Sequence, residues 1–254
     1  MDTDRLALLA LPAVRSVVAR ELGREIEYHE VIGSTQDRAR ELASAGHGLI
    51  VVVADQQTAG HGRADRTWHS APGAALLASW LFRPAPAEPA LFALLAGVAV
   101  ARALRSFAVA DAGLKWPNDV WLSNGKVAGC LAHGTGTDCV IGIGINVAQR
   151  SFPAELDGAA TSLARAGHEV DRLALLARLS VELDRVADPA ARTDALAESR
   201  KRSILLGREI DVLPTGGAAY RARAVDLAED GALVVESEQY GSQRIIAGEV
   251  RVRG

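Results

Sequence analysis

Several stretches of this sequence carry residue types that can hold an anion. The first is QTAGHGRADRTW at 57–68, which follows an apolar run and contains two glycines, a histidine and two arginines. Glycine lets the backbone approach a ligand closely, and arginine binds a carboxylate or phosphate through two hydrogen bonds at once. The stretch therefore predicts an anion-binding loop, with Trp68 anchoring its far end. A solvated glycine-rich surface loop remains the alternative.

A second polar stretch, KWPND at Lys115–Asp119, interrupts two apolar runs. Lys115 can offset phosphate charge, and a carboxylate such as Asp119 can ligate Mg²⁺. Asn118 can support either the metal or a ligand. A plain turn that contains proline would use similar residue types, so the pattern leaves both interpretations open.

Two glycine-containing stretches follow, GKVAG at Gly125–Gly129 and GIGIN at Gly142–Asn146. Lys126 opens an apolar strand, where it can extend towards solvent or point inward to stabilise developing negative charge. Alternating glycines weaken a strand unless something needs the space. A flat ligand across the sheet, with Asn146 as a hydrogen-bond partner, would need it, and so would a tightly packed helix.

The fifth stretch, Ser34–Asp37, has the spacing of a helix N-cap with its capping-box partner. A helix N-terminus also offers free N–H groups to a polar ligand. All five stretches fall between residues 34 and 146, and together they favour a reaction with a nucleoside triphosphate. A dinucleotide-binding fingerprint is excluded because its third glycine would fall at Asp65, and no GxxxxGK[ST] phosphate loop is present.

The elements that must position these residues form an α+β pattern, a mixed sheet with flanking helices. An amphipathic helix with a break at Pro12 is expected first, carrying Leu6, Leu9, Val14, Val17 and Val18 on its apolar face. Asn124-Gly125 predicts a hairpin, and His133–Thr137 predicts the next turn. Strands are expected at 25–32, 49–54, 74–82, 114–116, 120–122, 126–132 and 139–147. Helices are expected at 34–45, 88–107, 171–187 and 190–202.

After Leu206 the pattern changes to five short strands separated by glycine-containing turns. Such spacing is typical of a small SH3-like barrel. The sequence therefore predicts a large domain at 1–205, which carries all five stretches, and a C-terminal SH3-like domain at 206–254. The five strands are expected at 208–213, 219–227, 231–236, 242–246 and 249–252.

Composition limits the binding partners and the cellular compartment that can be expected. The chain has 254 residues, a formal net charge of −3 and two cysteines. This charge gives no general argument for binding nucleic acid or a membrane. Cys130 and Cys139 stand in apolar segments and are expected to be buried thiols in a reducing compartment. With neither a signal peptide nor a membrane span in the sequence, a cytoplasmic protein is expected.

These motifs resemble those of the biotin protein ligases. The stretch QTAGHGRADRTW is similar to their GRGRxxRxW biotin-binding loop, and ST, KWPND, GK-AG and GIGIN occur in the family's order over roughly residues 28–254. The resemblance implies a class II synthetase-like catalytic domain with a small C-terminal β-domain. It also implies a biotin–[biotin carboxyl-carrier protein] ligase, which activates biotin with Mg·ATP as biotinyl-5′-AMP and transfers it to an acceptor lysine.

The resemblance gives each motif residue an expected role. Arg63 and Lys126 are implied as catalytic, and Asp119 as a ligand of Mg²⁺. The residues implied to bind biotin are Ser34, Thr35, Gln57, Gly60, His61, Gly62, Arg63, Trp68, Trp116, Lys126 and Gly129. Those implied to bind the nucleotide are Arg63, Arg66, Lys115, Asn118, Lys126 and Asn146.

Three positions depart from the family pattern. His61 stands where the loop usually has arginine; a neutral imidazole is a weaker anion partner and adds pH dependence near its pKa. Gln36 replaces the usual asparagine, which puts little in doubt. His133 stands where relatives commonly carry an acidic residue, and nothing in the sequence accounts for it.

The implied partners are biotin, ATP and the biotin carboxyl carrier domain of acetyl-CoA carboxylase or a related carboxylase. Only 33 residues precede Ser34, too few for the winged DNA-binding domain of some family members, so a ligase without DNA binding or repressor activity is expected. A homodimer is compatible with the resemblance. A lipoate or octanoate transferase of related fold and a non-catalytic biotin-binding protein remain as alternatives.

Overall fold

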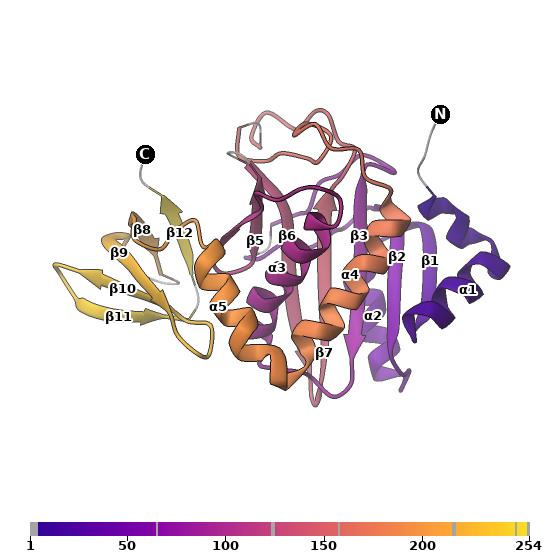
Figure 1. The fold of residues 1–254 in the computed structure, drawn as a ribbon, viewed down its shortest axis with the longest axis horizontal. Coiled ribbons are helices and arrows are strands. Elements are labelled where there is room, and N and C mark those ends of the chain that lie inside the picture. The colour runs from indigo at the N-terminus through magenta and orange to yellow at the C-terminus, as the bar shows by residue number, and fades with distance from the viewer. Residues whose placement is uncertain are drawn as a thin grey trace.

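The computed structural model describes residues 5–64, 66–122, 125–156, 158–214, 217–246 and 248–252. Within them, a seven-stranded mixed sheet has helices on both faces, and a five-stranded antiparallel sheet lies beside it (Figure 1). This arrangement confirms the predicted α+β class with a small all-β unit at the C-terminal end.

The large sheet has the strand order β1-β2-β3-β7-β6-β5-β4. β1 and β2 pair in parallel and all other neighbours pair antiparallel. The run β5-β6-β7 is the predicted meander, although Asn124 of its first turn lies outside the described residues. The strands are β1 (Glu25–Ile32), β2 (Ile50–Gln57), β3 (Ala75–Phe82), β4 (Gly113–Lys115), β5 (Asp119–Leu122), β6 (Gly125–Thr135) and β7 (Asp138–Asn146).

Helices cover the two faces of this sheet unequally. α3 and α4 lie together over one face, whereas α2 alone packs on the other (Figure 1). None of the helices in the described parts is long and apolar enough to cross a membrane. The helices are η1 (Leu6–Ala10), α1 (Pro12–Leu22), α2 (Thr35–Ser44), α3 (Pro89–Arg105), α4 (Arg172–Ala187), η2 (Pro189–Ala191) and α5 (Arg192–Arg202).

The alternation of side chains along the strands explains both faces. Val51, Val53 and Trp80 point into the main core with α3 and α4, whereas Val52 and Leu81 pack against α2. Because α2 is a ten-residue helix, it covers only part of its face. The uncovered part of that face is where the polar motifs meet.

Two predictions about local structure are wrong in detail. The turn predicted at His133–Thr137 comes too early, because β6 and β7 remain paired as far as Thr135 and Asp138. The N-terminal segment is two helices that meet at Pro12, as predicted. Leu6 and Leu9 are buried in the main core and Val18 packs against it, but Val17, predicted for the same apolar face, is 45% exposed.

The C-terminal sheet has the order β11-β10-β9-β8-β12. Its core is shared with the large sheet: Trp116 and Leu94 belong to the same buried cluster as its own apolar side chains, and Trp116 Nε1 donates to Gly231 O at 2.9 Å. Its strands are β8 (Glu209–Leu213), β9 (Tyr220–Leu227), β10 (Leu233–Ser237), β11 (Gly241–Ile245) and β12 (Glu249–Val252).

Candidate functional site

A cavity of about 360 Å³ lies on the face of the large sheet that α2 leaves uncovered. Its walls come from the start of α2, the glycine-containing loop after β2, the strands β3 to β7 and the beginning of β12. Every residue that the sequence predicted for the site lines this cavity, apart from Gly60. The structure therefore brings together motifs that are more than a hundred residues apart in the chain.

One end of the cavity is built from neutral polar groups. Thr35 donates to Gln57 Oε1 from its backbone N at 2.7 Å and from its Oγ1 at 2.9 Å. Thr35 Oγ1 also lies 2.9 Å from Ser79 Oγ. Ser79 was missed at the sequence level, although a lone serine in the apolar strand ALLASWLF is a usable signal. This end offers hydroxyl and amide groups to a neutral polar ligand.

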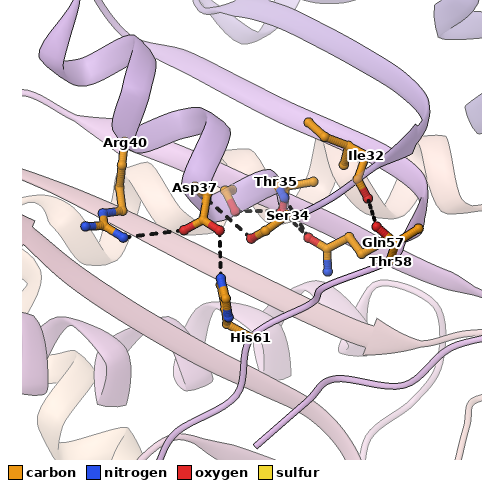
Figure 2. A network of polar contacts seen from close by, with 9 residues as sticks. Ile32, Ser34, Thr35, Asp37, Arg40, Gln57, Thr58 and His61 are labelled. Carbon is orange, nitrogen blue, oxygen red and sulfur yellow. Dashed lines mark hydrogen bonds and ion pairs between the residues drawn. The ribbon is translucent and has the colours of Figure 1, made fainter. Parts of the chain in front are cut away.

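The capping prediction for Ser34 is confirmed, because Ser34 Oγ accepts a hydrogen bond from Asp37 N at 3.3 Å. The predicted partner residue acts differently: the Asp37 carboxylate turns away from the cap towards His61 and Arg40 (Figure 2). The helix start is thus ordered by Ser34 and linked to the loop by Asp37.

The other end of the cavity is strongly cationic. Lys126 Nζ lies 2.6 Å from Asp119 Oδ1, and Arg66 forms an ion pair with Glu249. Lys115 Nζ lies 4.8 Å from the centre of the Trp121 ring. With Arg63, this end holds four cations but only two carboxylates, so it carries a net positive charge suited to an anionic ligand.

Burial acts on two of these cations. It lowers the pKa of Arg63 and the pKa of Lys115, in both cases against the opposing attraction of Asp119. Burial disfavours a charged group that has no partner, so a bound anion would relieve this cost. Lys126 also lies 5.6 Å from the centre of the Trp68 ring, which places its ammonium inside the cavity as predicted.

Glycines of β6 and β7 let the ring of Trp68 lie close to the sheet. A Cβ at Gly144 would lie 2.6 Å from Trp68 Cε2, and one at Gly129 would lie 3.2 Å from Trp68 Cζ3. At Gly142, the neighbours are Gln36 and Ser79. Helix packing, one of the two predicted reasons for these glycines, is confirmed at Gly142, where Gln36 of α2 lies close. At Gly144 and Gly129 the neighbour is instead Trp68, because only glycine lets its ring lie so close to the backbone.

The loop between β2 and β3 folds back on itself. Gly62 N donates to Arg66 O at 2.6 Å and Trp68 N donates to Gly60 O at 2.9 Å. Arg63 Nη2 reaches Gly248 O at 3.3 Å, so the loop also contacts the C-terminal sheet. Gly60 stands behind the cavity wall, where a Cβ would come within 2.8 Å of Gln57 Nε2.

The two asparagines have structural contacts as well as a place in the wall. Asn118 Nδ2 donates to Cys130 O at 2.7 Å, and Asn146 Nδ2 donates to Thr161 O at 3.0 Å. Asn146 Oδ1 is buried and has no hydrogen-bond partner among the described residues. A ligand that donates a hydrogen bond would satisfy it.

The described residues contain no group of three or more His, Cys, Asp or Glu side chains that could hold a metal ion. Asp119 is the predicted ligand, and one of its oxygens faces Lys126 at 2.6 Å. Magnesium is commonly bound by one or two carboxylates together with substrate phosphates and water. Asp119 as one protein carboxylate at the cationic end fits a metal that enters with a nucleotide.

Comparison with known proteins agrees with this geometry. Residues 28–147 match the model of the Biotin/lipoate A/B protein ligase family. The chain is 33% identical over 246 residues to the bifunctional ligase/repressor BirA of Bacillus subtilis, covering 91% of this chain and 75% of that protein. It is 33% identical over 228 residues to the biotin–[acetyl-CoA-carboxylase] ligase of Mycobacterium tuberculosis, covering 84% of each.

A solved structure of a biotin protein ligase is also similar to this chain. The biotin protein ligase from Aquifex aeolicus, in complex with biotin and ATP, superposes with a TM-score of 0.75 at 31% identity, covering 90% of this chain and 98% of that chain. The chain therefore belongs to the Biotin/lipoate A/B protein ligase family and, within it, to the biotin protein ligases.

Proposed function

We propose that this protein is an ATP-dependent ligase that activates biotin and attaches it to a lysine of an acceptor protein. A carboxylate oxygen of biotin attacks the α-phosphorus of ATP, and pyrophosphate leaves. The neutral amine of the acceptor lysine then attacks the mixed anhydride, giving an amide and AMP. The observation that carries the proposal is a single cavity with a neutral hydrogen-bonding end and a cationic end.

The two ends match the two parts of biotin. Ser34, Thr35 and Gln57 are proposed to hydrogen-bond the neutral ureido ring. Arg63 and Lys126 are proposed to contact the carboxylate and the α-phosphate, where they would stabilise the charge that develops during transfer. The reaction joins two anions, so most of the catalysis should come from positioning and charge neutralisation.

The nucleotide is proposed to occupy the cationic end. Arg66 and Lys115 would neutralise phosphate charge, and Asn118 and Asn146 would hydrogen-bond the nucleotide. Trp68 and Trp116 would shape the apolar wall together with Gly129, while Gly60, His61 and Gly62 would form the covering loop. Mg²⁺ bound to ATP would supply further charge neutralisation, with Asp119 as its proposed protein ligand.

The acceptor is proposed to be the biotin carboxyl carrier domain of a carboxylase. The net charge of −3 supports the expectation that the chain does not bind DNA. Cys130 and Cys139 are both free and buried, and burial raises the pKa of the Cys130 thiol to about 12. Disulfides are rare in reducing compartments, so two unpaired cysteines support a cytoplasmic location. Light scattering of the full chain measures whether the ligase is a monomer or a homodimer.

The test is pyrophosphate release by the full chain in the presence of biotin, ATP and Mg²⁺. Release that requires both biotin and ATP is expected; its absence would remove the ligase proposal and favour a biotin-binding protein without catalysis. A second assay offers labelled biotin or lipoate to their carrier domains. Transfer of lipoate but not biotin would instead identify a lipoate transferase, which the family as a whole includes.

A further inference from the structure

One contact between the loop and α2 has no role in the chemistry described above. His61 Nε2 lies 2.7 Å from Asp37 Oδ2, and the imidazole points directly at the carboxylate (Figure 2). The two side chains are 48% and 44% exposed, so solvent screens the contact without removing it. Asp37 belongs to the first turn of α2, where a negative charge is favoured by the helix dipole.

The carboxylate of Asp37 divides its oxygens between two partners. Arg40 Nη1 approaches Oδ1 at 3.4 Å, and His61 takes Oδ2. Other charged side chains on these two elements are engaged elsewhere: Arg38 with Glu27 and Glu41, Arg63 with Gly248 O, and Arg66 with Glu249. Among the described residues, Arg40 is thus the cation that shares Asp37 with His61.

The loop on the other side of the contact has little freedom next to His61. A Cβ at Gly60 would lie 2.8 Å from Gln57 Nε2, and a Cβ at Gly62 would lie 3.0 Å from Arg66 O. His61 also forms an isolated antiparallel bridge with Thr67. Because its neighbours are constrained in this way, the contact of His61 with Asp37 fixes the position of the whole folded loop.

The contact between His61 and Asp37 lies beside the neutral end of the cavity. Asp37 follows Ser34 and Thr35 in the chain, and Thr35 bonds to Gln57 at the base of the same loop. The loop is therefore held to α2 at two levels, at its base through Gln57 and further along through His61 (Figure 2). Its far side is held to the C-terminal sheet by Arg63 and Arg66.

We infer that Asp37 and His61 form a latch that positions the loop over the neutral end of the cavity and slows escape of the activated intermediate. In this role His61 is a positioning residue that acts through Asp37, not a direct partner of the anion. The inference rests on the proposed function, since the intermediate retained is biotinyl-5′-AMP. It gives a role at the loop to Asp37, which the sequence marked only as a capping-box partner.

The test measures how fast the full chain loses labelled biotinyl-5′-AMP that it has formed from biotin and ATP. Asp37→Ala and His61→Ala are each expected to speed the loss about two- to fivefold, the range of an exposed charged pair. The double variant should lose it no faster than either single one, because both remove the same contact. Glu41→Ala is the matched control, since it removes an exposed carboxylate with its own ion pair from the same helix.

His61→Arg tests the latch in the other direction. It should hold the intermediate as long as the unchanged protein does when Asp37 is present, and should lose it faster when combined with Asp37→Ala.

Two results would overturn the latch: a loss from Asp37→Ala equal to that from Glu41→Ala, or effects of the two single variants that multiply in the double variant. Failure of the proposed function is distinguishable, because the unchanged protein would then release no biotin-dependent pyrophosphate. Circular dichroism of Asp37→Ala and His61→Ala checks that α2 remains folded in both.

Discussion

Individual side chains at the cationic end neutralise one another in pairs. Lys126 pairs with Asp119 and Arg66 pairs with Glu249, while no carboxylate of the described residues forms an ion pair with Arg63 or Lys115. An anionic ligand can therefore be bound by the two unpaired cations first and then compete for the paired ones. The two ion pairs compensate the charges of Lys126 and Arg66 before a ligand binds, which limits the cost of burying those charges.

Lys126→Ala tests, at the scale of one residue, whether a paired cation of this end acts on the reacting anion. Adenylation is expected to slow about 10²- to 10³-fold, the range for removing one preorganised group that stabilises developing charge. Biotin affinity should change far less, because the ureido ring would still be held at the neutral end. Pyrophosphate release and biotin calorimetry measure the two effects, with the exposed Lys201→Ala as control. An unaltered rate would remove Lys126 from the proposed site.

At the scale of elements, α3 and α5 are joined by one carboxylate. Glu198 accepts from Arg102 Nε at 2.8 Å and from Arg202 Nε at 2.7 Å. Burial on its own would raise the pKa of Glu198, but the hydrogen bonds from Arg202 and Arg102 outweigh burial and hold this pKa below its ordinary value. The pairing of these helices is therefore linked to pH.

Glu198→Gln should show this linkage. A depressed carboxyl pKa contributes stability above the ordinary glutamate pKa, and this contribution is lost as the pH falls through the lower folded-state value. We expect Glu198→Gln to lower the free energy of unfolding by about 1–2 kcal/mol at pH 7 and by less at pH 3. Urea unfolding at several pH values measures the difference. For the exposed Glu209→Gln, the change in the free energy of unfolding should not become smaller from pH 7 to pH 3. The same pH dependence in both variants would contradict the prediction.

At the scale of the whole molecule, the small sheet completes the cavity. Glu249 and Val250 line it, and the loop reaches Gly248 O and Glu249. Trp116 connects the two sheets through its place in their shared core and its hydrogen bond to Gly231 O. We retain the division into domains at 1–205 and 206–254 as a proposal, and the shared core predicts that the two parts unfold together.

Trp116→Phe tests this coupling. It leaves the Gly231 carbonyl without its partner, so a loss of about 1–3 kcal/mol in the free energy of unfolding is expected, together with faster proteolysis near residues 203–208. Trp80→Phe is the matched control, since it removes an indole hydrogen bond from β3 to Ser180 of α4, away from the small sheet. Equal cleavage of both variants near residues 203–208 would contradict a special role of Trp116 in joining the sheets.

The sequence alone predicted most of the elements and many of the residues that line the cavity. The alternation of Glu25–Ile32, the cap at Ser34 and the hairpin before Lys126 are local signals, since each depends on backbone preferences within a few residues. The five ordered motifs also predicted part of the cavity's lining, because a ligand requires particular residue types at its walls, whereas Ser79 and Glu249 were not predicted. Helix register around Pro12 and the end of β6 were less predictable, since packing and strand pairing override local preference there.

Tertiary structure alone decided how the parts of the site use one another. That Trp68 occupies the space above Gly144, that Glu249 pairs with Arg66 and that His61 meets Asp37 all depend on where distant segments of the chain lie. Local propensity carries no information about such contacts, because they form only when the sheet, the loop and the C-terminal strands are packed together. The sequence thus predicted many of the residues that line the cavity, and packing determined which of them position the others.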